Sequence, residues 1–287
     1  MIARLTGGNG LDLAVDVDSG ARIISLTTAD GGEWLAPSHP TRQPSEAPSF
    51  KHAGMGGWDE VAPTVQPDTL PDGTVLRDHG DVWNVPWIEL ESAPGSLKLG
   101  VEIASIRTTL SRTIAATSTG LRMSYRAATT SMRPVPFLWA AHPQFSATPA
   151  STLLLALRDV EVLPQLVEHY PVAGAVRKFD HRPFDEWAPS GCSLKTFVAA
   201  GQAVDSATLT GPGEFSLRLS WDPMQLPYLG LFWDNREFAP NRVFAVEPST
   251  GFGDVTSAAL ENNQVSLLPR ERPLEWWIDL ASERAQR

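Results

Sequence analysis

Apolar and polar residues alternate along the start of the chain with a period of two. In residues 11–17, leucine and valine alternate with aspartate at several positions, which indicates a β-strand with one face in water. Asp18-Ser19-Gly20 has the composition of a turn, and residues 21–28 form a second strand candidate that ends at Asp30-Gly31-Gly32. We therefore expect a β-hairpin here.

Strand-like segments continue at short intervals to the end of the chain. They are rich in threonine and valine, have little helical periodicity, and cover residues 97–106, 108–117, 121–130, 152–157, 214–221, 228–233, 242–247, 264–268 and 274–280. The best helix candidate is short, at residues 256–262, with Asp254 or Thr256 as its N-cap. Residues 37–53 have no period, and we expect a long surface loop. So many strands with so few helices predict an all-β fold, a large antiparallel sandwich or barrel.

No internal repeat and no low-complexity linker divides the 287 residues, so we expect a single domain over residues 1–287. The formal net charge of −10 disfavours a nucleic-acid partner, because phosphate backbones select basic surfaces. The first residues lack the apolar core of a signal peptide, and no apolar run reaches the ~18 residues of a membrane span. With a single cysteine, Cys192, the composition predicts a cytoplasmic protein with no membrane partner.

The richest chemistry lies in residues 77–87, with the sequence Arg-Asp-His-Gly-Asp-Val-Trp-Asn-Val-Pro-Trp. Titratable groups among flat aromatic rings suit a polyhydroxylated small molecule, whose C–H patches stack on the rings while its hydroxyls meet the polar groups. Two later segments, 139–145 and 244–251, carry His142 and Glu247 after apolar runs. We expect the three segments to meet in one cleft.

Glu247 follows four apolar residues and precedes a proline. A glutamate that continues an apolar strand is costly to bury unless it is paired or functional, which favours a general base over a solvated strand end. His79 is either a surface-loop histidine or a functional one, and two nearby tryptophans and Arg77 make the alternatives about equal. His142 is either a hydrogen-bonded core residue or a ring presented at the bent end of a strand.

Several of the ten tryptophans are expected to be packing residues, namely Trp34, Trp187, Trp221 and at least one of Trp276 and Trp277 in the terminal strand. Trp58, Trp83 and Trp87 lie in glycine- and proline-rich contexts, where stacking on a sugar is more plausible. Asp59-Glu60 places two carboxylates beside Trp58. The sequence has no glycine-rich phosphate loop, no His-Glu-x-x-His, no cysteine pair and no Gly-x-Ser-x-Gly, which weighs against nucleotide, zinc and serine-hydrolase sites.

An ordered set of short motifs resembles the aldose 1-epimerases of the galactose mutarotase-like superfamily. The set is Gly56-Gly57-Trp58-Asp59-Glu60, His79-Gly80, His142-Pro143-Gln144-Phe145, Tyr228-Leu229-Gly230-Leu231-Phe232-Trp233, Glu247-Pro248 and Leu268-Pro269. Each motif is weak alone, but together they run in the family's order over most of the chain.

The resemblance implies a galactose mutarotase-like antiparallel β-supersandwich that binds a small-molecule sugar and needs no metal or cofactor. It implies Glu247 as general base, His142 as general acid and His79 as an assisting group at the ring oxygen. The remaining substrate-binding candidates are Arg77, Asp81, Trp83, Trp58, Glu60 and Asp234. The family's substrate-binding aspartate has three candidates here, Asp81, Asp222 and Asp234.

Three alternatives remain open from the sequence. A hexose-6-phosphate 1-epimerase needs cations for the phosphate, and Arg42, Arg77, Arg133 and Arg236 are available. A glycoside hydrolase needs a carboxylate pair, for which Glu247 with Glu60 or Asp81 are candidates. A carbohydrate-binding protein without catalysis is the third.

Overall fold

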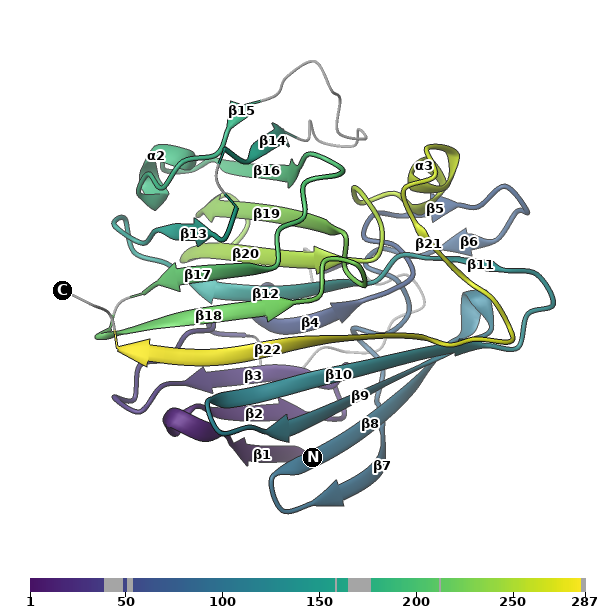
Figure 1. Ribbon diagram of the computed structural model, residues 1–287, viewed down its shortest axis with the longest axis horizontal. Coiled ribbons are helices and arrows are strands. Elements are labelled where there is room, and N and C mark those ends of the chain that lie inside the picture. The colour runs from purple at the N-terminus through teal and green to yellow at the C-terminus, as the bar shows by residue number, and fades with distance from the viewer. Residues whose placement is uncertain (39–48, 51–53, 158, 165–176, 212, 285–287) are drawn as a thin grey trace.

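The computed structural model describes residues 1–38, 49–50, 54–157, 159–164, 177–211 and 213–284. Most of the predicted 37–53 loop therefore lies outside the described residues. Two large antiparallel sheets dominate, one of ten strands and one of eight, and their strands run in similar directions (Figure 1). The predicted all-β antiparallel sandwich is confirmed.

The ten-stranded sheet has the order β1-β2-β3-β4-β12-β20-β19-β16-β14-β15. Its strands are β1 (Ile2–Thr6), β2 (Asp12–Asp16), β3 (Arg22–Thr27), β4 (Gly57–Val61), β12 (Ala140–Ser146), β20 (Arg242–Ser249), β19 (Tyr228–Asn235), β16 (Ser193–Val198), β14 (Glu161–Pro164) and β15 (Arg177–Lys178). The predicted first hairpin is β2–β3. The strands that join it to β20, namely β4 and β12, were not predicted as strands.

The eight-stranded sheet has the order β13-β17-β18-β22-β10-β9-β8-β7. Its strands are β13 (Leu153–Leu155), β17 (Ser206–Thr210), β18 (Phe215–Trp221), β22 (Leu274–Arg284), β10 (Gly120–Thr129), β9 (Thr108–Ala116), β8 (Ser96–Ile103) and β7 (Ile88–Ala93). Two small pairs, β5 (Asp68–Thr69) with β6 (Val75–Leu76) and β11 (Val135–Phe137) with β21 (Ser266–Leu268), lie at one end of the long strands (Figure 1).

The helical elements of the described residues are short. They are α2 (Phe184–Trp187), α3 (Thr256–Glu261) and two 3₁₀ turns, Gly8–Gly10 and Ala104–Ile106. The helix predicted at 256–262 is present as α3, but its capping was predicted wrongly. Val255 occupies the N-cap and makes no side-chain cap hydrogen bond. The first turn of α3 is instead held by Ser257, whose backbone N–H and hydroxyl both donate to the Asp68 carboxylate.

Aromatic side chains fill the space between the two sheets. Trp139 comes directly before β12, and its ring lies 4.6 Å from Tyr125 of β10 and 5.0 Å from Trp276 of β22. Trp58 of β4 has no exposed surface and meets Phe145 of β12 edge-on at 6.1 Å. Odd-numbered residues of β12 therefore face the other sheet. Because side chains alternate along a strand, His142 and Gln144 face the opposite side of the ten-stranded sheet.

No helix among the described residues is both long enough and apolar enough to traverse a membrane.

Candidate active site

Strand register places His142 and Glu247 on one face of the ten-stranded sheet. β12 pairs with β20 so that Ala140 lies opposite Ser249 and Phe145 opposite Phe244, and the same register sets His142 opposite Glu247. Directly opposed residues of an antiparallel pair point to the same face. His142 Nε2 lies 3.8 Å from Glu247 Oε1, and both side chains are nearly buried.

The same face continues across the neighbouring strands. Asp59 of β4 lies opposite His142 on one side, and Gly230 of β19 lies opposite Glu247 on the other. Gly230 in turn lies opposite Phe197 of β16. The candidate site is thus a row across five adjacent strands, polar toward β4 and aromatic toward β16.

His79 reaches this row from the loop before β7, and its backbone bends sharply to do so. His79 has a φ of 56° and Gly80 a φ of 74°, so the chain passes through two successive left-handed residues. A Cβ at Gly80 would lie 1.9 Å from the Ala62 carbonyl oxygen, so only glycine fits there. The His79 N–H donates to Val65 O at 2.7 Å, which holds the turn against the segment after β4.

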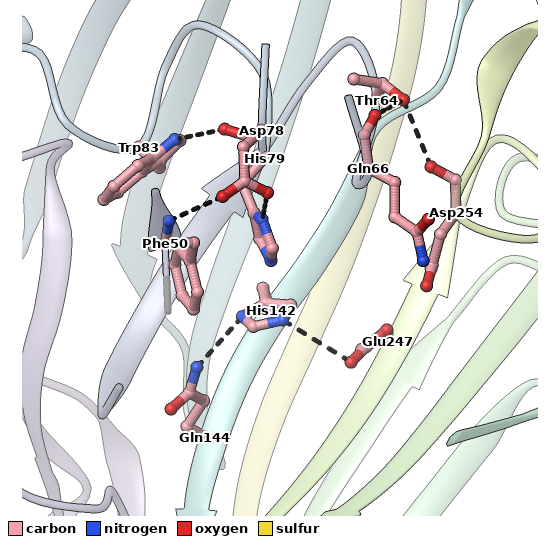
Figure 2. Close-up of polar contacts among 10 residues, drawn as sticks. All are labelled: Phe50, Thr64, Gln66, Asp78, His79, Trp83, His142, Gln144, Glu247 and Asp254. Atoms are coloured by element: carbon pink, nitrogen blue, oxygen red, sulfur yellow. Dashed lines mark hydrogen bonds and ion pairs between the residues drawn. The ribbon is translucent and has the colours of Figure 1, made fainter. Parts of the chain in front are cut away.

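The His79 ring is oriented from both sides. Its Nδ1 lies 2.7 Å from Asp78 Oδ1, which leaves Nε2 for another partner. The ring meets His142 at a right angle, with 5.3 Å between centroids, and stacks on Phe50 at 4.0 Å. Figure 2 shows His79 pointing toward His142, which lies between Gln144 and Glu247. The Asp78 carboxylate also accepts the Phe50 N–H at 2.7 Å.

Electrostatics favours an ionised Asp78. Burial alone would raise the pKa of Asp78, but the hydrogen bond and positive charge of His79 and the Phe50 N–H outweigh it, so the pKa is lowered. Asp78, ionised and hydrogen-bonded to Nδ1, thus orients the His79 ring.

Glu247 has two different oxygen environments. Oε2 accepts a hydrogen bond from the ammonium group of Lys195, from β16. Oε1 is buried, faces His142, and accepts no hydrogen bond from any residue the structure describes. Lys195 Nζ also lies 3.7 Å from Asp254 Oδ1, at the start of the segment leading to α3. The ammonium group of Lys195 therefore forms ion pairs with two carboxylates, those of Glu247 and Asp254.

The segment after β4 links the two halves of the site. Val65 N–H donates to the Asp254 carbonyl at 3.1 Å and Gln66 N–H to the same oxygen at 2.9 Å, while Val65 O accepts from His79. Thr64 Oγ1 lies 3.2 Å from that carbonyl oxygen as well (Figure 2). These bonds fix His79 relative to Asp254, and through Asp254 relative to Lys195.

The sequence-predicted residues His79, His142 and Glu247 thus come together, although they lie in three distant segments. The remaining candidates do not converge in the same way. Arg77 and Asp81 pair with each other at 3.3 Å, and the second Asp81 oxygen accepts the Ser105 N–H at 2.9 Å.

Two acidic candidates have structural partners elsewhere. Glu60 points between the sheets, where Arg112 donates to it at 2.8 Å and Tyr125 at 2.9 Å, so the expected substrate contact is wrong for this side chain. Asp234 closes the turn between β19 and β20 by accepting the N–H groups of residues 237–239. It lies four residues along β19 from Gly230, the residue that faces Glu247.

The tryptophan candidates are core residues. Trp58, Trp83 and Trp87 are 0%, 1% and 3% exposed, so none presents a face to a ligand. The indole N–H of Trp83 donates to Asp78 O at 3.0 Å, and its ring packs on Phe50. Through these two contacts Trp83 stabilises the loop that carries His79. The aromatic rings on the site face are instead the half-buried Tyr228 and Phe232 and the buried Phe197.

Sequence reasoning did not single out Lys195, Asp254, Phe50 or Gln144 as functional residues. Gln144 is fixed by accepting the Gly56 N–H and lies 3.4 Å from His142 Nδ1. Lys195 carried one weak signal, a charged residue inside the strand-like run 193–198. Its relation to Glu247 depends on the pairing of β16, β19 and β20, which no local pattern encodes.

Solved structures with the same architecture were found by comparison. The galactose mutarotase-like protein of Lactobacillus casei ATCC 334 superposes with a TM-score of 0.71 at 14% identity, over 99% of this chain and 100% of that one. The chain has the galactose mutarotase-like fold. The GalM/aldose epimerase homologue of C. elegans shares this fold with a TM-score of 0.72, at 13% identity over 100% and 99% of the two chains.

The Slr1438 protein of Synechocystis sp. PCC 6803 is also similar, with a TM-score of 0.75 and 17% identity over 99% of this chain and 96% of that one. No protein-family model matches the sequence, and no curated protein gives a significant match. At these identities the comparisons establish the galactose mutarotase-like fold, while the chemistry must be argued from the side chains.

Proposed function

We propose that the protein is an aldose 1-epimerase, which interconverts the α- and β-anomers of a sugar without a cofactor. The observation that carries this proposal is the 3.8 Å separation of His142 Nε2 and Glu247 Oε1. Anomer exchange needs a base at the anomeric hydroxyl and an acid at the ring oxygen. Both oxygens are bonded to C1, so the two catalytic groups must be close neighbours.

The steps follow from the two groups. Glu247 Oε1 removes the proton of the C1 hydroxyl, the C1–O5 bond breaks as C1=O1 forms, and His142 gives its proton to O5. Rotation about C1–C2 turns the other aldehyde face to the O5 hydroxyl. Ring closure then runs with the roles reversed, His142 taking the O5 proton and Glu247 returning a proton to O1.

His79 has a supporting role in this scheme. Because Asp78 holds its Nδ1, His79 presents Nε2 beside His142 at the same end of the reacting bond. A charged His79 would stabilise negative charge that develops on O5 when the ring opens. Phe232 and Tyr228, half-buried on the same face, offer surfaces for the C–H groups of the sugar ring.

A glycoside hydrolase has less support, because hydrolases of that type place two carboxylates across the scissile bond. Glu60 and Asp81, the expected partners of Glu247, are engaged with Arg112 and with Arg77. A histidine lies opposite Glu247 instead. Asp254 shares Lys195 with Glu247, so its carboxylate lies beside the base rather than across from it.

A phosphorylated sugar also has less support. Arg77 is paired with Asp81, and Arg236 donates to Ser190. Arg133 is exposed, and Arg42 lies outside the described residues. Lys195, the cation nearest Glu247 in the described part of the chain, is already matched by two carboxylates. The candidate site therefore offers little positive charge to a phosphate.

The test is anomer exchange on a panel of freshly dissolved aldoses, followed by polarimetry and by saturation-transfer NMR. Acceleration that disappears in Glu247→Gln supports the proposal. Glucose and glucose 6-phosphate are compared in the same assay, and a strong preference for the phosphate would reverse the ranking above. Sugar binding by calorimetry without any acceleration would identify a carbohydrate-binding protein instead.

A further inference from the structure

Lys195 is the nearest cation to Glu247 among the described residues, and nothing in the reaction scheme above uses it. It extends from β16, separated from β20 by β19. Lys195 lies opposite Phe232 of β19 in the strand pairing. Its ammonium nitrogen lies 6.0 Å from the centre of the Phe232 ring and 5.3 Å from the centre of the Phe197 ring. The side chain crosses an aromatic surface to reach Glu247.

Gly230 makes this approach possible. It lies between Phe197 and Glu247 in the row across the sheet. A Cβ at Gly230 would lie 2.9 Å from Glu247 Oε2 and 3.1 Å from Phe197 Cε1. The missing side chain leaves room for the carboxylate to rest above β19, where Lys195 meets it.

The ammonium group is enclosed and remains charged. Burial alone would lower the pKa of Lys195, but the negative charges of Asp254 and Glu247 and their hydrogen bonds outweigh it, so the pKa is raised. A buried ammonium is stable only with such partners. Asp254 and Glu247 in turn would repel each other without it.

The pairing is asymmetric for Glu247. Lys195 holds Oε2, and Oε1 is left facing His142 with no donor among the described residues. A carboxylate free to rotate would present either oxygen. Held by one oxygen, it presents the other in a fixed direction, and its negative charge has a permanent counterion.

We propose that Lys195 is a positioning residue for the base: it fixes Glu247 through Oε2, aims Oε1 at the substrate, and supplies the counterion that Glu247 shares with Asp254. This inference rests on the proposed function. It predicts a site whose base depends on a three-residue cluster, Lys195, Glu247 and Asp254, rather than on Glu247 alone.

The experiment compares Lys195→Met, which keeps the length of the side chain without its charge, with Lys195→Arg, which keeps the charge. In Lys195→Met we expect kcat for anomer exchange to fall about 10²-fold, because a misdirected catalytic group costs that much, with little change in KM. The acid limb of the kcat profile should move to higher pH by about 1 to 3 units, because the opposite charge is lost. Lys195→Arg should restore part of kcat and most of the pH profile.

Two further variants separate charge from packing. Adding Asp254→Asn to Lys195→Met should return the acid limb toward its original position, because the neighbouring negative charge is removed as well. Lys178→Met is the matched control, since Lys178 is an exposed lysine whose ammonium lies 3.5 Å from the exposed Asp159. It should leave kcat and the pH profile unchanged.

A readout that needs no activity is carboxylate ¹³C NMR, with the Glu247 signal assigned by its loss in Glu247→Gln. Its titration midpoint should move to higher pH in Lys195→Met. If Lys195→Met does not fold, Lys195→Arg and Asp254→Asn in the folded protein give the same comparison, the latter moving the midpoint to lower pH.

The outcomes distinguish the two proposals. If the wild-type protein exchanges anomers and folded Lys195→Met matches it in kcat, pH profile and Glu247 titration, the role of Lys195 is overturned and the epimerase proposal stands. If the wild-type protein accelerates no sugar, the proposed function fails and this inference fails with it, whatever the titration shows.

Discussion

Gly230 and Glu247 lie opposite each other on β19 and β20, and a Cβ at Gly230 would come within 2.9 Å of Glu247 Oε2. Gly230→Ala should therefore displace the carboxylate from its place above β19. We expect kcat to fall by up to about 10²-fold, the effect of a shift near 1 Å in a reacting group. Steady-state polarimetry on the variant measures this.

Gly100→Ala is the control for that substitution. Its Cβ would lie 2.8 Å from the side chain of Leu90, which is 52% exposed and can move aside. The control should keep kcat. Equal losses in both variants would show that the effect is a general one on the sheets and not on Glu247.

Glu247→Gln tests the base directly. The amide keeps the shape and a hydrogen-bonding end but has no basic oxygen, so kcat should fall about 10²- to 10⁴-fold while sugar binding survives. His142→Asn should have a similar effect. The double variant should lose far less than the product of the two, because acid and base act in one step.

The control here is Glu261→Gln, at the exposed end of α3. It should exchange anomers at the wild-type rate. Near-normal turnover in folded Glu247→Gln would show that Glu247 is a structural residue of β20 and not the base. Another carboxylate would then have to be the base, and Asp254 would be tested first.

The Asp78–His79 pair predicts a stability that depends on pH. The pKa of Asp78 is lowered from 3.8 in the folded protein, so its stabilising effect is fully present above the unfolded value and is lost as pH falls through the lower folded value. Asp78→Asn should therefore be less stable than the wild type at pH 7, and the difference should begin to shrink near pH 3.8 and vanish once the pH is below the lowered folded pKa. Urea denaturation over a pH series measures the difference, and one that persists at the acidic end would contradict the assignment.

Arg112 and Glu60 form an ion pair between the two sheets, with no exposed surface on either side chain. Removing one partner of a buried pair leaves an uncompensated charge, so Arg112→Met should lower the free energy of unfolding by about 3–5 kcal/mol. Arg112→Met with Glu60→Gln should recover part of this. Chemical denaturation monitored by tryptophan fluorescence measures both.

Arg126→Met provides the comparison, since Arg126 pairs with Glu275 at 3.5 Å on the exposed face of β10 and β22. A surface pair is worth about 0–1 kcal/mol, so this variant should be nearly as stable as the wild type. If both arginine variants lose the same small amount, the pair between the sheets does not carry the stability assigned to it.

Much of the fold was predictable because each strand carries its own signal. Alternating residues and turn dipeptides located β2, β3, β9 and β10 within one residue of their observed bounds, whereas the segment predicted at 97–106 runs three residues past the end of β8. β4 was missed because its glycines resemble a loop, and because Trp58-Asp59-Glu60 does not alternate apolar with polar residues. That error placed Trp58 and Glu60 at the site when their side chains face the other sheet.

The site was predictable only in part. Glu247 and His142 stand out locally, one as a charge that continues an apolar run and the other before a proline within a motif. Lys195 and Asp254 do not stand out locally, because their place in the site depends on which strands are neighbours in the sheet. Gly230 is a similar case, since its role is visible only once Glu247 lies opposite it.

His142 and Glu247 lie on strands from the middle and from near the end of the chain, joined by a single strand pairing. A slip of one residue in that pairing would turn one of the two side chains into the core. Turnover therefore shows that β12 and β20 have paired in the correct register. Circular dichroism measures strand content and cannot distinguish the correct register from a slipped one. During refolding, catalysis should return only after this late, non-local step, behind the recovery of strand content.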